Sequence, residues 1–205
     1  MPEDIAYPVI SLTGCQTPER YAYHLGFSIT AWYMYVGIRH VETYIVPIVS
    51  DPLRKKARNA VLAAYVAIVG VFGQGWITLQ ADAVDALILH KGAMRIQSVI
   101  HQLFAAMFFI GSFGHCVYSL IVYWCDDAFP IAGWHRSRWI KAACFVFPFF
   151  GSFVAMMFHP VNDDVIQHTA QNMAVAGISQ VVTVLAYVGY YASYGLDLYH
   201  LTAFH

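Results

Sequence analysis

Five long apolar runs constrain this chain more than any other feature. They cover residues 21–46, 58–80, 95–124, 137–158 and 169–196, and clusters of charged residues, proline and glycine separate them. A helix needs roughly 20 apolar residues to cross the hydrocarbon core of a bilayer, so each run is long enough to span. The sequence therefore predicts an all-α integral membrane bundle of five transmembrane helices.

The composition agrees with a membrane environment. Hydrophobic residues make up 59% of the 205 residues and charged residues only 11%, whereas soluble domains carry roughly 25% charged residues. The formal net charge of −1 gives no basic excess that would attract nucleic acid. We expect residues 1–20 to form an extracytoplasmic N-terminal segment and residues 21–205 to form a single transmembrane domain.

The distribution of basic residues predicts an orientation. Eight of them fall on one side of the predicted bundle and three on the other: Arg39, Arg54, Lys55, Lys56, Arg58, Arg136, Arg138 and Lys141, against Arg20, Lys91 and Arg95. Because basic residues are retained on the inner side of membranes, the N-terminus is expected outside and the C-terminus inside. The candidates for contact with lipid phosphates on the inner side are Arg54, Lys55, Lys56, Arg58, Arg136 and Arg138.

Glycines in the second and third runs predict close helix packing. Gly70, Gly73 and Gly75 lie within two turns of one another, and Gly111 and Gly114 are similarly placed on the next helix. Small residues let the backbones of membrane helices approach one another, so these two helices are expected to pack together.

Polar residues gather in the predicted outer loops and outer helix ends. They are Ser11, Thr13, Glu19, His101, Asp163, Asp164 and His168. Acid, histidine and hydroxyl groups together can support hydrolysis at a lipid headgroup. However, neither G-x-S-x-G nor H-E-x-x-H is present. We therefore favour structural capping of loops, predict no catalytic residue, and keep Ser11, Thr13, Glu19, His101 and His168 as outer lipid-binding candidates.

Histidine spacing raises a second alternative. His101 and His115 are 14 residues apart on one predicted helix, about 21 Å along its axis and near the same face. This spacing suits two stacked b-type haems, with His24 and His40 on the first helix as opposite ligands. Interfacial or hydrogen-bonded histidines explain the same pattern without a metal, so no cofactor other than structural phospholipid is expected.

Several short motifs resemble one known family. Ile10, Ser11, Thr13, Gly14, Pro18 and Glu19 follow the spacing of its outer motif, Ile-Ser-Asp-Thr-Gly, three residues, Pro-Glu. The stretches "VGVFGQGWITLQ", "HQLFAAMFFIGSFGHCVYSLI" and "QHTAQNMAVAG" resemble three of its helices. By these motifs, which cover nearly the whole chain, the sequence resembles the FRAG/DRAM/SFK family of damage-regulated autophagy modulators, with His101 and His168 at the positions of its helix-leading histidines.

The chain also departs from that family. Family members usually carry another helix before the outer motif, Leu12 stands in place of aspartate, and Val175 stands near a glutamate of some members. Ionisable groups near membranes are costly and tend to be kept for function, so their loss argues against retained chemistry.

These observations predict a non-catalytic accessory subunit of a larger membrane complex that contacts other membrane subunits and binds lipids. A mitochondrial respiratory or ATP synthase complex in the inner membrane is the expected host. The alternatives are a lipid-handling or autophagy-linked protein of endomembranes, including the lysosomal membrane, as the family resemblance implies, and the haem-binding membrane protein.

Overall fold

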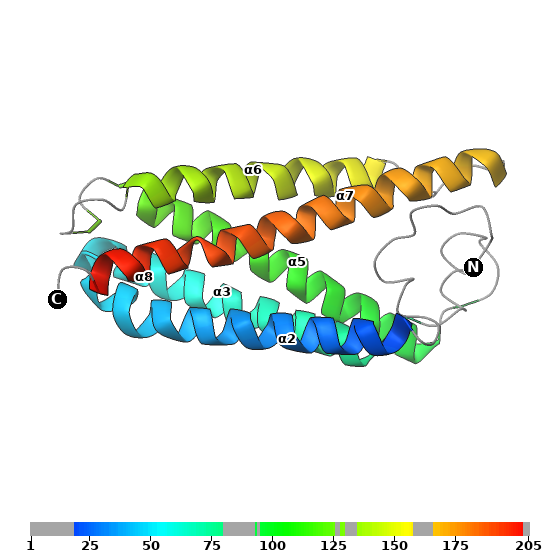
Figure 1. The fold of residues 1–205 in the computed structure, drawn as a ribbon, viewed down its shortest axis with the longest axis horizontal. Helices are drawn as coiled ribbons and strands as arrows, with labels where there is room; N and C mark the ends of the chain where they lie inside the picture. The colour runs from blue at the N-terminus through cyan, green and yellow to red at the C-terminus, as the bar shows by residue number, and fades with distance from the viewer. Residues whose placement is uncertain are drawn as a thin grey trace.

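The computed structural model describes residues 19–79, 93, 95–125, 128–129, 135–157 and 166–202, and every element within them is helical (Figure 1). The long helices are α2 (Glu19–His40), α3 (Asp51–Trp76), α5 (Ile96–Tyr123), α6 (His135–Met157) and α7 (Ile166–Ala192). A π-helical turn, η1 (Val41–Ile45), and a 3-10 turn, η2 (Val46–Ile48), continue α2, and a short helix, α8 (Tyr194–Thr202), follows α7. The prediction of an all-α chain with five long helices is confirmed.

The start of α3 differs from the prediction. The basic stretch at residues 54–58 was expected in the connection before the second helix, but it forms the first turns of α3. Pro52 occupies the beginning of the helix, where its fixed φ is favourable and its missing N–H is not needed. Lysine, arginine and alanine then propagate the helix, because these residues have high helix propensity.

The helices alternate in direction along the chain and form a bundle. The closest pairs are α3 with α5 and α6 with α7, and α2 packs on α3 (Figure 1). As a result the end of α2, the start of α3, the end of α5, the start of α6 and the short α8 all lie at one end of the bundle (Figure 1). We call this end the basic end, because residues 54–58 and Arg138 belong to it.

The predicted packing through glycine is confirmed at the α3–α5 contact. A Cβ atom added to Gly111 would lie 2.6 Å from the backbone nitrogen of Ala67, and one added to Gly70 would meet the backbone of Phe108. Each helix thus places a glycine against the other helix's backbone, so the two axes can approach closely. Gly114 is less constrained, since its added Cβ would lie 3.5 Å from the Cβ of Ala63.

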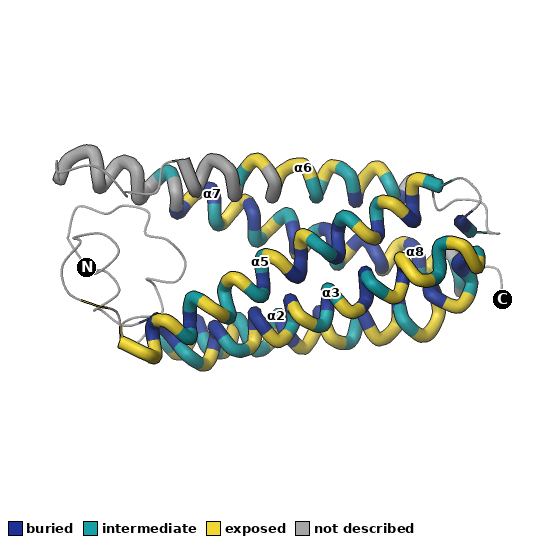
Figure 2. The backbone as a smooth tube through the Cα atoms, turned by 180° about the vertical axis from the view of Figure 1, so that it is seen from behind, coloured by how far each residue is buried: buried dark blue, intermediate teal, exposed yellow. Residues whose placement is uncertain are grey.

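Two of the described helices, α3 and α5, are long and apolar enough to cross a membrane, a property that buried core helices of water-soluble proteins share. Buried residues follow the inner sides of the helices, and exposed ones follow the outer sides (Figure 2). Ile38, Ala64, Ala67 and Tyr190 are among the core residues with no exposed surface.

Candidate functional site

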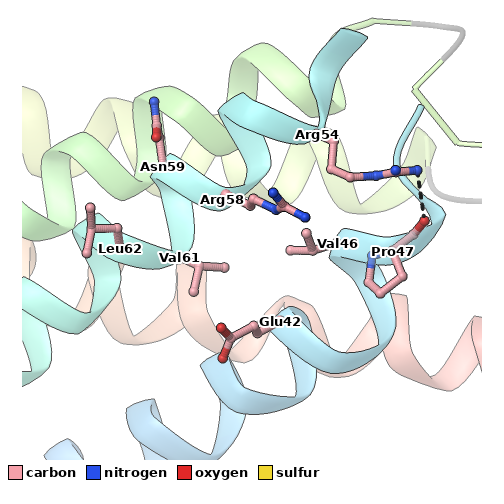
Figure 3. A pocket seen from close by; sticks show the side chains of 8 residues that line it. All are labelled: Glu42, Val46, Pro47, Arg54, Arg58, Asn59, Val61 and Leu62. Carbon is pink, nitrogen blue, oxygen red and sulfur yellow. Dashed lines mark hydrogen bonds between the residues drawn. The ribbon is translucent and has the colours of Figure 1, made fainter. Parts of the chain in front are cut away.

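A hollow of about 640 Å³ lies at the basic end, between the η1–η2 segment and the first turns of α3 (Figure 3). Polar and apolar side chains share its lining, which consists of Glu42, Val46, Pro47, Arg54, Arg58, Asn59, Val61 and Leu62. We call this hollow the basic groove. Its volume falls within the range of small-molecule sites, roughly 300 to 1,000 Å³.

The backbone geometry at the end of α2 shapes the basic groove. The chain changes from α-helix to the π-helix of η1 at Val41 and then to the 3-10 helix of η2 at Val46. π-Helical turns are rare and occur frequently at functional sites. Arg54 reaches back from α3 and donates hydrogen bonds from Nη2 to the carbonyls of Pro47 (3.3 Å) and Val49 (3.2 Å). It thereby ties the two walls of the groove together.

The electrostatics of the groove are dominated by its arginines. The Glu42 carboxylate accepts hydrogen bonds from Arg39 (2.6 Å) and from the Tyr65 hydroxyl (2.7 Å), so its charge is already partnered. Arg54 forms an exposed ion pair of 2.7 Å with Asp51. Arg58 has no hydrogen bond or ion pair among the described residues, and its guanidinium points into the groove near Val46 (Figure 3). The groove therefore presents a cation that is available to an anion.

The other residues predicted to contact phosphate lie outside the groove or on another helix. Lys55 and Lys56 are exposed on α3 and do not line the groove. Arg138 lies instead on α6, with its guanidinium carbon 5.5 Å from the ring centroid of Trp124 and 5.8 Å from that of Trp139. The side chain of Arg136 lies outside the described residues.

The predicted outer candidates are only partly described. Ser11 and Thr13 lie outside the described residues, as does the side chain of His168. Glu19 is exposed at the first turn of α2. His101 is fully buried, its Nδ1 lies 2.6 Å from the carbonyl of Ile77, and its Nε2 has no hydrogen-bond partner among the described residues. No contact among the described residues joins His101 to Glu19, so the structure does not assemble an outer site from them.

The four histidines of the haem alternative each have a backbone partner. The Nδ1 atoms of His24, His40, His101 and His115 contact the carbonyls of Gly75, Val36, Ile77 and Ala60. In the described part of the chain, no group of three or more histidine, cysteine or acidic side chains is placed to hold a metal ion. These contacts match the hydrogen-bonded alternative of the sequence analysis.

A buried ion pair is the main polar feature that the sequence analysis missed. Lys141 Nζ of α6 lies 2.8 Å from Asp197 Oδ2 of α8, with side-chain exposures of 0% and 6%. The ammonium also donates to the hydroxyls of Ser137 (2.6 Å) and Ser193 (2.8 Å), and the Tyr123 hydroxyl donates to Asp197 Oδ2 (2.6 Å). In the part of the chain that the structure describes, Oδ1 of Asp197 is buried without a hydrogen-bond partner.

Tyrosine rings enclose the Lys141 ammonium. The nitrogen lies 4.1 Å from the ring centroid of Tyr194, 4.6 Å from that of Tyr123 and 5.9 Å from that of Tyr190. A desolvated cation over an aromatic face gains about 2 kcal/mol, so the rings stabilise the ammonium where water cannot. We call Lys141, Asp197 and these three tyrosines the buried charge cluster.

His115 extends the polar contacts toward the middle of α5. Because its Nδ1 donates to the Ala60 carbonyl (2.8 Å), its Nε2 is the acceptor for the Tyr194 hydroxyl (3.1 Å). The Ser119 hydroxyl oxygen lies 2.8 Å from the Tyr194 hydroxyl oxygen and is its second hydrogen-bond partner. The imidazole stacks on Tyr191 with a centroid separation of 4.9 Å and an interplanar angle of 7°. A cavity of about 20 Å³ borders Ser119, Tyr123 and Tyr194, which is room for roughly one water molecule.

The sequence did contain a signal for the buried charge cluster. Lys141 falls inside the fourth apolar run, and Asp197 follows the fifth directly. Two opposite charges at the same depth on neighbouring predicted helices indicate a pair, because an unpaired charge is costly there. Lys141 was instead counted among the inner basic residues, and the structure corrects that view by burying it completely.

No family model matches the chain, no curated protein matches its sequence, and no solved structure matches its fold.

Proposed function

We propose that this protein is a multi-pass integral membrane protein that acts as a non-catalytic accessory subunit of a larger membrane complex and binds lipids. Its five long helices span the bilayer, with the N-terminus outside and the C-terminus inside. The proposal rests on one observation above all, which is the contrast between an apolar exterior and a charged interior.

Large apolar side chains are exposed on all five long helices. Trp32 on α2 is 63% exposed, Leu62 on α3 is 64% exposed and Ile110 on α5 is 71% exposed. Phe147 on α6 and Leu185 on α7 are exposed to 61% and 64%. Exposed apolar patches of large extent mark contact with a membrane or with another protein. Exposure on every long helix favours lipid and neighbouring membrane subunits as the surroundings.

The interior has the opposite character. Lys141 and Asp197 are both buried, and ionisable groups within membrane helices typically face the bundle interior and pair with one another. If hydrocarbon surrounds the bundle, a charged side chain is more stable in the interior beside an opposite charge than on the outer surface. The pairing of Lys141 with Asp197 therefore fits a membrane environment.

The orientation is supported by the basic end. Arg54, Lys55, Lys56 and Arg58 occupy the start of α3 at this end, and basic residues favour the inner side of membranes. Trp124, at the end of α5, and Trp139, in the first turns of α6, lie at the same end, 48% and 61% exposed and 5.2 Å apart between ring centroids. Partly exposed tryptophans are enriched at the membrane–water boundary.

A structural role of the buried charge cluster is supported by the small space beside it. The cavity beside it has a volume of about 20 Å³, which is far below the few hundred Å³ of a typical substrate site. A buried network without room for substrate is suited to fixing the arrangement of α5, α6 and α8.

The decisive experiment is purification of the tagged protein in mild detergent, followed by mass spectrometry of the proteins that remain bound. We expect a stable set of membrane subunits, and the mitochondrial inner membrane is the compartment we propose to examine first. Migration of the protein alone, at its own mass plus detergent, would refute the accessory role. Release of the protein from membranes by alkaline carbonate would refute membrane integration.

The family resemblance supports a second candidate, a lipid-handling or autophagy-linked protein of endomembranes. The spacing of Ser11, Thr13 and Glu19 favours it. If this candidate is correct, Ser11→Ala should change membrane lipid composition or leaflet asymmetry in cells. Endomembrane localisation of the native protein, together with altered lipids in this variant, would favour it over the accessory role.

A further inference from the structure

We propose that the basic groove is a binding site for one acidic phospholipid, with its phosphate on Arg58 and Arg54 and an acyl chain along Leu62. The inference rests on the proposed function, because it requires that the basic end lie at the inner surface of a membrane. It adds a ligand class and a defined site to the general lipid binding proposed above.

The groove has the two-part chemistry that a phospholipid requires. Arg54, Arg58 and Asn59 supply donors on one part of the lining, and Val46, Val61 and Leu62 supply apolar surface on another. In Figure 3 the Arg58 guanidinium lies between α3 and η2, while Leu62 lies one turn farther along α3, away from its start. Under the proposed orientation, this direction runs from the headgroup region toward the hydrocarbon. A headgroup at Arg58 therefore leaves its acyl chain beside Leu62, which is 64% exposed.

The charges in the groove favour an anion in spite of Glu42. Arg39 and Tyr65 already hold that carboxylate. Arg54 is held in place before any ligand arrives, by its bonds to Pro47 and Val49 and by its exposed ion pair with Asp51, so Arg58 carries the charge left unpaired among the residues that the structure describes. A pre-positioned guanidinium beside one with unused donors matches the geometry of phosphate, which arginine binds through parallel hydrogen bonds. Basic pockets between membrane helices on the inner side bind acidic lipid headgroups in the same way.

A free phosphate ion shares the headgroup chemistry, so the test must separate the two. The probe is phosphatidylserine at a fixed fraction in phosphatidylcholine nanodiscs, and native mass spectrometry of the ejected protein counts the bound lipids. The test variants are Arg58→Gln and Arg54→Gln/Arg58→Gln. Lys55→Gln/Lys56→Gln is the matched control, because it removes two exposed charges of the same helix that do not line the groove.

We expect wild type and the lysine control to retain one phosphatidylserine molecule and Arg58→Gln to bind it roughly tenfold more weakly, as the loss of a charge-assisted hydrogen bond implies. Arg58→Gln carries the test if the double arginine variant does not fold, since Arg58 is exposed and has no hydrogen bond or ion pair within the described ranges.

Three results would overturn the lipid site. They are equal lipid retention by Arg58→Gln and wild type, equal loss in the lysine control, and displacement of phosphatidylserine by inorganic phosphate at a similar concentration. The last result would show that the site needs only the ion. Carbonate extraction of each variant separates these outcomes from failure of the membrane proposal. If Arg58→Gln stays in the membrane and still retains phosphatidylserine as wild type does, the lipid site is contradicted and membrane integration is not.

Discussion

Removal of one partner from the buried ion pair should destabilise the protein severely, and removal of both should not. In Lys141→Met, the Asp197 carboxylate keeps only the Tyr123 hydroxyl as a donor, because its Oδ1 has none to begin with. A buried charge that has lost its partner costs about 3 to 5 kcal/mol. We expect a loss of this size in the free energy of unfolding.

Asp197→Asn should cost less than Lys141→Met. The Lys141 ammonium would still donate to Ser137 and Ser193 and would keep the rings of Tyr123 and Tyr194. A lost hydrogen bond to a charged group is worth about 1.5 to 3 kcal/mol, and we expect a loss in that range. The asymmetry arises because two serine hydroxyls and the tyrosine rings still stabilise the lone cation, whereas the lone carboxylate keeps only the Tyr123 hydroxyl.

The double variant Lys141→Met/Asp197→Leu removes both charges and restores apolar volume. Replacement of a buried ion pair by packed apolar residues is often neutral or stabilising. We therefore expect the double variant to be more stable than Lys141→Met alone. The assay is reversible unfolding of the purified protein in mixed detergent micelles, with helical circular dichroism as the signal. Lys55→Met, at an exposed position of α3, is the control and should stay within about 0.5 kcal/mol of wild type.

The reasoning would be refuted by additive losses. If the double variant lost the sum of the losses measured for Lys141→Met alone and Asp197→Leu alone, Lys141 and Asp197 would not be coupled, and the 2.8 Å contact would carry no energy. A loss below about 1 kcal/mol in Lys141→Met would equally show that water reaches the pair, since that is the range of exposed ion pairs.

Further predictions concern packing, the histidine and lipid. Gly111→Val should destabilise by about 1 to 3 kcal/mol in the same assay, because its Cβ would lie 2.6 Å from the Ala67 nitrogen, whereas Gly114→Ala should be tolerated, and equal losses would contradict the close contact. His115→Phe should cost about 1 to 3 kcal/mol by removing the acceptor of the Tyr194 hydroxyl and a donor to Ala60; an unchanged midpoint would show that water replaces the imidazole. Phosphatidylserine at about 100 times its dissociation constant should stabilise wild type by about 2.7 kcal/mol and Arg58→Gln by clearly less, and equal stabilisation of the two would argue against a role of Arg58 in binding.

The helices were predictable because they depend on local information. Apolar length located all five, and the glycines predicted the α3–α5 contact because residues at 70 and 111 need only be small to permit it. The second apolar run begins at 58 because the charged residues before it indicate the end of a helix, whereas α3 begins at Asp51. Basic residues are good helix formers, and Pro52 marks where the helix begins.

The sites were less predictable because they depend on contacts between distant residues. The sequence indicated that Arg54, Lys55, Lys56 and Arg58 share one end, but only the helix geometry directs Arg54 and Arg58 to the groove and leaves the two lysines outside it. The partner of Lys141 is 56 positions away, on a short helix that was not separated from the fifth run. The depth of Lys141 in its apolar run indicated that it needs a partner, but only the fold brings Asp197 to it.

The basic groove and the buried charge cluster share a wall. Glu42 of η1 lines the groove, and Ile45 of the same turn borders the small cavity that also touches Tyr123 and Tyr194. Tyr123 and Tyr194 in turn contact the Lys141 ammonium. The π-helical turn η1 therefore packs between a surface site for an anion and an interior cation, and it also contacts α8 directly. Because η1 contacts both the groove and α8, a variant of the charge cluster that displaces α8 is expected to displace one wall of the groove as well.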